Sequence, residues 1–157
     1  MYARTRPCLR LLAYRPPRIA MLLLVVATAL HFAFIGLVPT LPSAPALAVA
    51  AASLGLLIML RAWWLFGKVQ TAICPTARTT TLITEDVYRL TRNPMYLGIF
   101  LMLFGVAILT GGLFHHAAAF AFFTAIDHAF CPYEERKLRQ EFPGEFDVYA
   151  DRVRRWI

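Results

Sequence analysis

The sequence of 157 residues contains no G-x-G triplet. That spacing lets a backbone approach a bound dinucleotide, so its absence gives no support to a Rossmann-type methyltransferase and weakens a nicotinamide-dependent reductase. Cysteine is also scarce: Cys8, Cys74 and Cys131 are odd in number, and all lie in segments expected on the reducing, cytoplasmic side. We therefore expect no disulfide framework.

Histidine is equally sparse, and its spacing does not suggest a metal site. His31 and the His115-His116 pair lie toward one expected membrane side and His128 toward the other. No two of them stand four residues apart on one helix with a third ligand nearby. We expect no bound metal, and His115-His116 is interpreted as a polar turn at the outer interface.

Hydrophobic residues, in contrast, are abundant. They make up 59% of the chain, and the mean hydropathy is +0.59. Such a composition predicts one all-α integral membrane domain over residues 1–157. The last two apolar runs are short and predict a tight hairpin, since a full crossing takes about 20 residues. The expected spans are Ile19–Val38, Ala46–Phe66, Met95–Thr110 and Leu113–Phe130.

Basic residues are distributed in agreement with four crossings. All 16 Lys and Arg residues fall before the first span, between the inner end of the second and the start of the third, or after the fourth. The Pro39–Pro45 connection and the Gly111-Gly112 turn carry no charge. Positive residues favour the cytoplasmic side, so both termini are expected there. The net charge of +7 then reflects topology and attraction to anionic lipid rather than nucleic-acid binding.

A cleaved signal peptide is the main alternative for the first span, because arginines precede it and Ala44-Pro45-Ala46 resembles a cleavage site. The apolar run argues against cleavage, since it is longer than the 7 to 15 residues or so of a signal-peptide core.

The polar connector, residues 67–93, ends in a helix-start signal. Asn93 is expected to cap the third span and Pro94 to occupy its first position, where a missing N–H costs nothing. The free N–H groups at that helix start, together with Arg92, favour an anionic ligand group. Earlier in the connector, residues 79–83 are β-prone, and Thr84 is expected to cap a short helix reaching Thr91.

The tail, residues 131–157, is charged and amphipathic. A Pro143-Gly144 break predicts two short helices. The second would carry Phe146, Tyr149, Val153 and Trp156 on one face and lie in the membrane interface, either as an anchor or as a lid over a site.

Together these segments resemble the isoprenylcysteine carboxyl methyltransferase and phospholipid methyltransferase family of membrane enzymes. The matching parts are TLITEDVYRLTRNPMYLG, an apolar hairpin, EERKLRQEF and the closing YADRVRRWI, which span about Thr79 to Ile157. The motif is fairly specific because Arg-(His or Asn)-Pro-x-Tyr-x-Gly and a later Glu-Glu must occur together, in order, around a hairpin. Asn93 and the Arg-Val-Arg-Arg-Trp ending resemble bacterial members, which implies the inner membrane.

The resemblance implies S-adenosylmethionine as methyl donor, bound at the cytoplasmic face. Donor binding is carried onto Leu82, Ile83, Tyr88, Asn93, Pro94, Met95, Tyr96 and Glu134, and Gly98 and Glu135 match the motif as well. Arg92 with the helix start suits the donor carboxylate, and Glu134 or Glu135 the ammonium or ribose hydroxyls. Leu82, Ile83 and Tyr88 suit the adenine, and Tyr96 the sulfonium methyl. Gly98 and Gly105 could instead permit close helix packing.

Four positions depart from the family pattern. Asn93 replaces a common His and cannot change charge. Asp86 stands where Gly is frequent, which Asp tolerates in a left-handed backbone. Phe130 stands where eukaryotic prenylcysteine enzymes have an Arg for the acceptor carboxylate, so a prenylcysteine acceptor is in doubt. Pro143 replaces a usual Gly.

Function is therefore predicted as methyl transfer to a lipophilic or membrane-delivered acceptor, which can be a carboxylate, thiol or amine of prenylcysteine-like or phospholipid-like type. No dedicated catalytic base is nominated, because alignment and desolvation dominate such a displacement. The alternative is a non-catalytic four-span scaffold or transport subunit. The enzyme hypothesis requires that the start of the third span and the segment after the fourth meet in one pocket.

Overall fold

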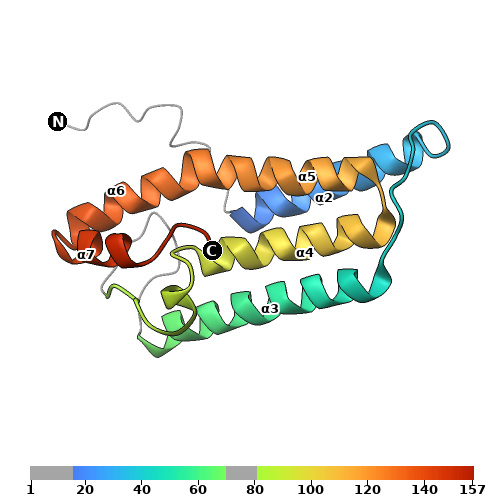
Figure 1. The fold of residues 1–157 in the computed structure, drawn as a ribbon. Coiled ribbons are helices and arrows are strands. Elements are labelled where there is room, and N and C mark those ends of the chain that lie inside the picture. The colour runs from blue at the N-terminus through green and yellow to red at the C-terminus, as the bar shows by residue number, and fades with distance from the viewer. Residues whose placement is uncertain (1–15, 70–80) are drawn as a thin grey trace, which may run out of the picture.

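The computed structural model describes residues 16–69 and 81–157, and every regular element in these two ranges is helical. Four helices form an antiparallel bundle, and a helical tail covers one end of it (Figure 1). In chain order the elements are α2 (Pro16–Ala33), α3 (Pro45–Lys68), the 3-10 helix η1 (Asp86–Arg89), α4 (Pro94–Thr110), α5 (Leu113–Ala125), the π-helical turn η2 (Ile126–Phe130), α6 (Cys131–Glu141) and α7 (Glu145–Arg152).

Helix boundaries agree with the second and third expected spans to within two residues. The first span is displaced: α2 begins at Pro16 and ends at Ala33, five residues short of the expected Val38. A turn follows, and Gly36 with φ 81° marks a left-handed backbone that a helix cannot continue through. The fourth span does not end at Phe130, because η2 leads straight into α6 and the helical rod runs on to Glu141.

Two helices, α2 and α3, are long and apolar enough to cross a membrane, and α4 is a shorter apolar helix. Only 17% of the apolar window of either long helix is buried inside the protein. Met21, Leu22, Leu47 and Leu57 are each at least 59% exposed. A soluble core helix would bury such side chains, so these faces suit contact with lipid.

Small residues allow α3 and α4 to approach closely. A Cβ atom on Gly98 would lie 2.5 Å from the carbonyl oxygen of Gly55, and one on Gly105 would lie 2.8 Å from that of Ala48. Both glycines therefore serve helix packing, the alternative raised for them above. The tight hairpin between α4 and α5 is confirmed, with Gly111 at φ 62° in its turn.

The connector differs from its prediction in three details. Its described part, from Thr81, forms no strand. The short helix is capped by Glu85 rather than Thr84, with no side-chain capping bond, and it ends at Arg89 rather than Thr91. Asp86 begins η1 with φ 59°, a left-handed backbone, as expected for a residue at a position where family members often have Gly. The Oδ1 atom of Asp86 accepts a hydrogen bond from the Val87 N–H at 2.8 Å, which is how a short acidic side chain stabilises this backbone.

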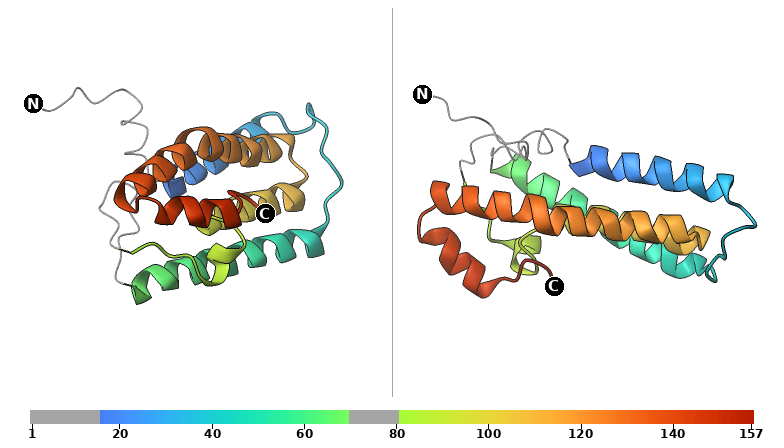
Figure 2. Two further views of the ribbon diagram at one scale, coloured as in Figure 1. Left: turned by 60° about the vertical axis from the view of Figure 1, so that its left-hand side comes forward. Right: turned by 90° about the horizontal axis from the view of Figure 1, so that it is seen from above.

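The tail packs against protein. The predicted break at Pro143-Gly144 separates α6 from α7, and the views in Figure 2 place α7 across the end of the bundle. Phe146, Tyr149 and Val153 are buried against Leu82 and Leu138, so this face is not available to lie in the interface. Trp156 falls beyond the end of α7 and does not share its face.

Candidate active site

The start of α4 and the start of α6 meet, although 38 residues separate their key side chains. The Tyr96 hydroxyl donates a hydrogen bond to Oε1 of Glu134. Tyr96 is held there because α4 begins at Pro94, and Glu134 because η2 carries the α5 rod on into α6 without a break. The juxtaposition required by the enzyme hypothesis is thus present.

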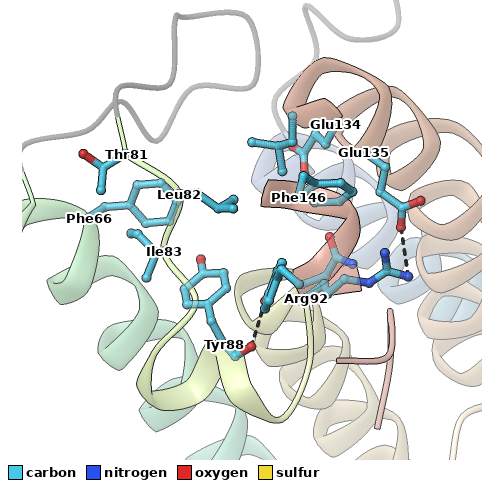
Figure 3. Close-up of a pocket in the computed structure, with 12 residues that line it drawn as sticks. Phe66, Thr81, Leu82, Ile83, Tyr88, Arg92, Glu134, Glu135 and Phe146 are labelled. Atoms are coloured by element: carbon cyan, nitrogen blue, oxygen red, sulfur yellow. Dashed lines mark hydrogen bonds and ion pairs between the residues drawn. The ribbon is translucent and has the colours of Figure 1, made fainter. Parts of the chain in front are cut away.

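Two neighbouring cavities surround this contact. The first, here called the connector cavity, lies between the connector, α6 and α7 (Figure 3). Its walls are mainly aromatic and aliphatic, with Arg92 and the carboxyl groups of Glu134 and Glu135 as the charged groups. The remaining lining residues are Phe66, Thr81, Leu82, Ile83, Tyr88, Asn93, Leu138, Phe146 and Tyr149.

The second cavity, the interhelical cavity, has a volume of about 450 Å³ and lies between the starts of α2 and α4 and the last turns of α3. This size is typical of a site for a small molecule. Trp63, which is 58% exposed, is among its lining residues. The others that it does not share with the connector cavity are Pro16, Pro17, Pro94, Met95, Tyr96 and Ile99.

The two cavities adjoin, since Phe66, Tyr88, Arg92, Asn93, Glu134 and Leu138 line both. Leu82, Ile83 and Glu135 line only the connector cavity, and Pro94, Met95 and Tyr96 only the interhelical one. Gly98 lines neither, because it lies in the contact with α3. Ten of the eleven predicted site residues are therefore brought together around one paired cavity.

Sequence reasoning missed several wall residues. Phe66 was assigned only to a span, and Phe146 and Tyr149 to an interfacial helix for which an anchor and a lid over a site were both left open. Leu138 could have been found, since it follows Glu134 by four residues in α6 and so lies on the same helix face. Nothing in the sequence indicates that Trp63 and Ile99 lie beside the connector.

Glu134 is the most perturbed carboxyl group of the site. Burial raises its pKa to about 7, although the Tyr96 hydroxyl and the charge of Lys137 act in the opposite direction. Removal from water disfavours the charged form of an acid. Glu134 is thus poised to change charge near neutral pH, and it faces both cavities.

Arg92 supplies positive charge to both cavities. Its side chain is 15% exposed, and its Nε atom is buried with no hydrogen-bond partner among the described residues. One guanidinium nitrogen forms an ion pair with Oε1 of Glu135 at 3.5 Å, which is too long for a good hydrogen bond (Figure 3). A buried donor without a partner is costly, so this atom is available to an anionic ligand group.

Glu135 is already occupied. Arg155 donates to both of its oxygens, from Nε at 2.8 Å and from the second terminal nitrogen at 3.0 Å. Burial works against the carboxylate, but the hydrogen bonds from Arg155 and the charge of Arg92 outweigh it and lower the pKa of Glu135. Of the predicted pair, Glu134 is the carboxyl group left for a ligand.

Asn93 corrects a prediction. It stands at the N-cap position of α4, but its side chain makes no capping bond. Its Nδ2 atom instead donates to the Arg155 carbonyl oxygen at 3.3 Å. The amide therefore connects the start of α4 to the chain after α7.

Two contacts of the connector, one to α7 and one to α3, hold Tyr88 in the cavity wall. Its carbonyl oxygen accepts a hydrogen bond of 2.7 Å from the Tyr149 hydroxyl. Two residues earlier, Asp86 receives the Arg61 Nε–H at 2.9 Å, and this hydrogen bond lowers the pKa of Asp86. The connector is thereby tied both to α7 and to α3.

The fold and the paired cavity together define a helical protein with lipid-compatible faces and a buried, charged site at one end of its bundle. The family model described as phospholipid methyltransferase matches residues 43–145, which is most of the chain, and the protein belongs to that family. It is therefore a member of a family of membrane methyltransferases. Neither the search of curated proteins nor that of solved structures found a match.

Proposed function

We propose that this protein transfers a methyl group from S-adenosylmethionine to a lipophilic acceptor at the cytoplasmic face of the membrane. The observation that carries the proposal is the convergence of Arg92, Glu134 and an apolar aromatic wall on two adjoining cavities. A donor with an adenosine, a carboxylate and positive charge needs these three environments, and an acceptor needs the second cavity.

The residues present fit the donor. The unpartnered Arg92 Nε and the start of α4 suit its carboxylate, and Glu134 suits its ammonium or ribose hydroxyls. Leu82, Ile83, Tyr88, Phe66 and Phe146 offer a wall for the adenine. Bound in this way, S-adenosylmethionine supplies a methyl group on a good leaving group, so the protein has to align the partners and exclude water.

The interhelical cavity is proposed for the acceptor, which would enter from the lipid past the exposed Trp63. Phe130, at the position of the acceptor-binding Arg in prenylcysteine enzymes, is only 2% exposed and packs in the bundle core. This arrangement favours a phospholipid-like acceptor. If that acceptor is an ammonium group, it must lose a proton, and Glu134 is the carboxyl group that faces both cavities.

The proposed setting is four crossings of the inner membrane with both termini inside. In Figure 1 the described ends that carry arginine and lysine, those of α2, α3 and the tail, lie toward the same end of the bundle. The site lies at that end, where a water-soluble donor has access from the cytoplasm.

Calorimetric titration of the detergent-solubilised protein with S-adenosylhomocysteine tests donor binding. We expect saturable binding that is weakened at least about tenfold in Glu134→Ala and Tyr96→Ala, since each loses a polar contact in the cavity. Val148→Ala, an exposed position on α7, is the control and should bind like the wild type. A wild-type protein that binds neither the donor nor its product would be a scaffold or transport subunit, and the proposal would be wrong.

A further inference from the structure

The chain after α7 returns to the site, where it contacts both the segment before α4 and the η2–α6 segment. Figure 1 shows its end beside the start of α4. We call residues 154–156 the C-terminal clasp. The Arg92 N–H donates to the Arg154 carbonyl oxygen at 3.0 Å, and the Thr91 hydroxyl donates to the Arg155 carbonyl oxygen at 2.7 Å. The clasp thus holds the backbone immediately before α4.

The side chain of Arg155 binds the η2–α6 segment. Besides its two hydrogen bonds to Glu135, it donates to Oδ1 of Asp127 at 3.1 Å. The same Asp127 oxygen accepts the indole N–H of Trp156 at 2.8 Å. Asp127 lies in η2, a π-helical turn, and such turns are frequent at functional sites. The clasp therefore joins η2, α6 and the start of α4.

This geometry sets up a competition for Glu135. A carboxylate accepts a fork of two parallel N–H bonds, and Arg155 supplies that fork while Arg92 stays at 3.5 Å. If Arg155 were absent, Arg92, which already lies 3.5 Å from this buried carboxylate, would pair with it fully. A paired Arg92 could no longer meet an anionic ligand group.

We propose that Arg155 is a positioning residue for donor binding, because its fork on Glu135 leaves Arg92 with only a 3.5 Å ion pair to that carboxylate and so lets Arg92 meet the donor carboxylate. The inference rests on the proposed function, and it gives the two adjacent glutamates different tasks. Glu134 faces the ligand, whereas Glu135 anchors the clasp.

Four variants test this by titration with S-adenosylhomocysteine: Arg155→Gln, Glu135→Gln, the double variant and Arg139→Gln. Arg155→Gln should weaken binding about ten- to a hundredfold, the range expected when a charge-assisted contact is lost. Glu135→Gln should lose clearly less affinity than Arg155→Gln, because it removes the carboxylate charge that would otherwise hold Arg92. The double variant should recover most of the affinity that Arg155→Gln loses.

Arg139→Gln is the matched control, since it breaks another arginine ion pair, the exposed one to Asp147, and removes only the weakest of the charges that lower the pKa of Glu135, so it should leave affinity unchanged. A clasp that only stabilised the fold would not show the rescue, and thermal unfolding measured alongside detects loss of structure. If Arg155→Gln does not fold, Glu135→Gln alone still decides, because weak binding would make Glu135 a donor ligand and overturn the inference. Unchanged affinity in Arg155→Gln would also overturn it while leaving the proposed function intact. Only failure of the wild type to bind would remove both.

Discussion

Glu134 and Glu135 are neighbours in sequence but differ in environment. Burial raises the pKa of Glu134 to about 7, whereas Arg155 and Arg92 lower that of Glu135. The sequence predicted that this pair belongs to the site, but it left open which glutamate meets the donor. That distinction depends on Arg155, which stands 20 residues further along the chain, and no local pattern encodes such a contact.

The raised pKa of Glu134 predicts a pH-dependent affinity for the donor. Below about pH 7 Glu134 is protonated, and a positively charged donor favours its carboxylate. Affinity for S-adenosylmethionine should therefore rise with pH up to about 7, approaching about tenfold per pH unit well below the pKa, and then level off. Titrations at several pH values measure this, and Glu134→Gln should abolish the dependence. A wild-type profile as flat as that of the variant would contradict this role of Glu134.

At the scale of elements, the hydrophobic runs and the proline and glycine residues at their ends predicted most helix positions. Pro45 and Pro94 stand at the first helical positions of α3 and α4, and Gly111 lies in the turn between α4 and α5. The end of α2 and the function of α7 were not predictable. A turn through Gly36 stops α2 inside an apolar run, and the amphipathic face of α7 has the same pattern whether lipid or protein covers it.

Close contact between α3 and α4 predicts that Gly98→Ala is destabilising. The added methyl group would meet the Gly55 backbone, which cannot move aside, so the helices must separate at a cost of about 1 to 3 kcal/mol. Thermal unfolding in detergent measures the effect. Gly67→Ala is the control, because a Cβ there meets nothing within 4 Å, and it should be neutral or slightly stabilising. Equal stability of the two variants would show that the contact is not tight.

The packing of α7 predicts that its buried face supports the site rather than membrane attachment. Phe146 is 1% exposed and lines the connector cavity, so Phe146→Ala should weaken S-adenosylhomocysteine binding by at least about tenfold. The share of the Phe146→Ala protein recovered in the membrane fraction should equal that of the wild type. Val148→Ala, at a 53% exposed position on the same helix, should leave both unchanged. Release of Phe146→Ala from membranes with intact binding would restore the anchor interpretation.

For the whole molecule, hydropathy and charge predicted a helical membrane protein, and the fold and family agree with that. The meeting of Tyr96 with Glu134 was anticipated through the family resemblance and not from composition. The clasp could not be anticipated, since it depends on how the tail folds back across the bundle end. Local patterns therefore predicted the elements, whereas their long-range contacts needed the structure.

The proposed topology, with four crossings and both termini inside, predicts the labelling of introduced cysteines. Thr40 lies in the α2–α3 loop and Gln140 near the end of α6, and both are exposed. A membrane-impermeant maleimide should label Thr40→Cys in intact cells but label Gln140→Cys only after permeabilisation. Cys131 is fully buried and should not react. The protein without an introduced cysteine is the control, because it reports any labelling of Cys8 and Cys74. Labelling of Gln140→Cys in intact cells would contradict the orientation.

The most direct test of the central claim is transfer of a tritiated methyl group from S-adenosylmethionine. Purified protein would be incubated with the labelled donor and vesicles made from a bacterial lipid extract, and the lipid fraction would be counted. We predict label in lipid with the wild type and with Val148→Ala, and at least about a tenfold lower rate with Glu134→Gln and with Tyr96→Phe. Equal labelling by all four proteins, or none by a wild type that binds the donor and has been offered amine, thiol and carboxylate lipids, would contradict the claim.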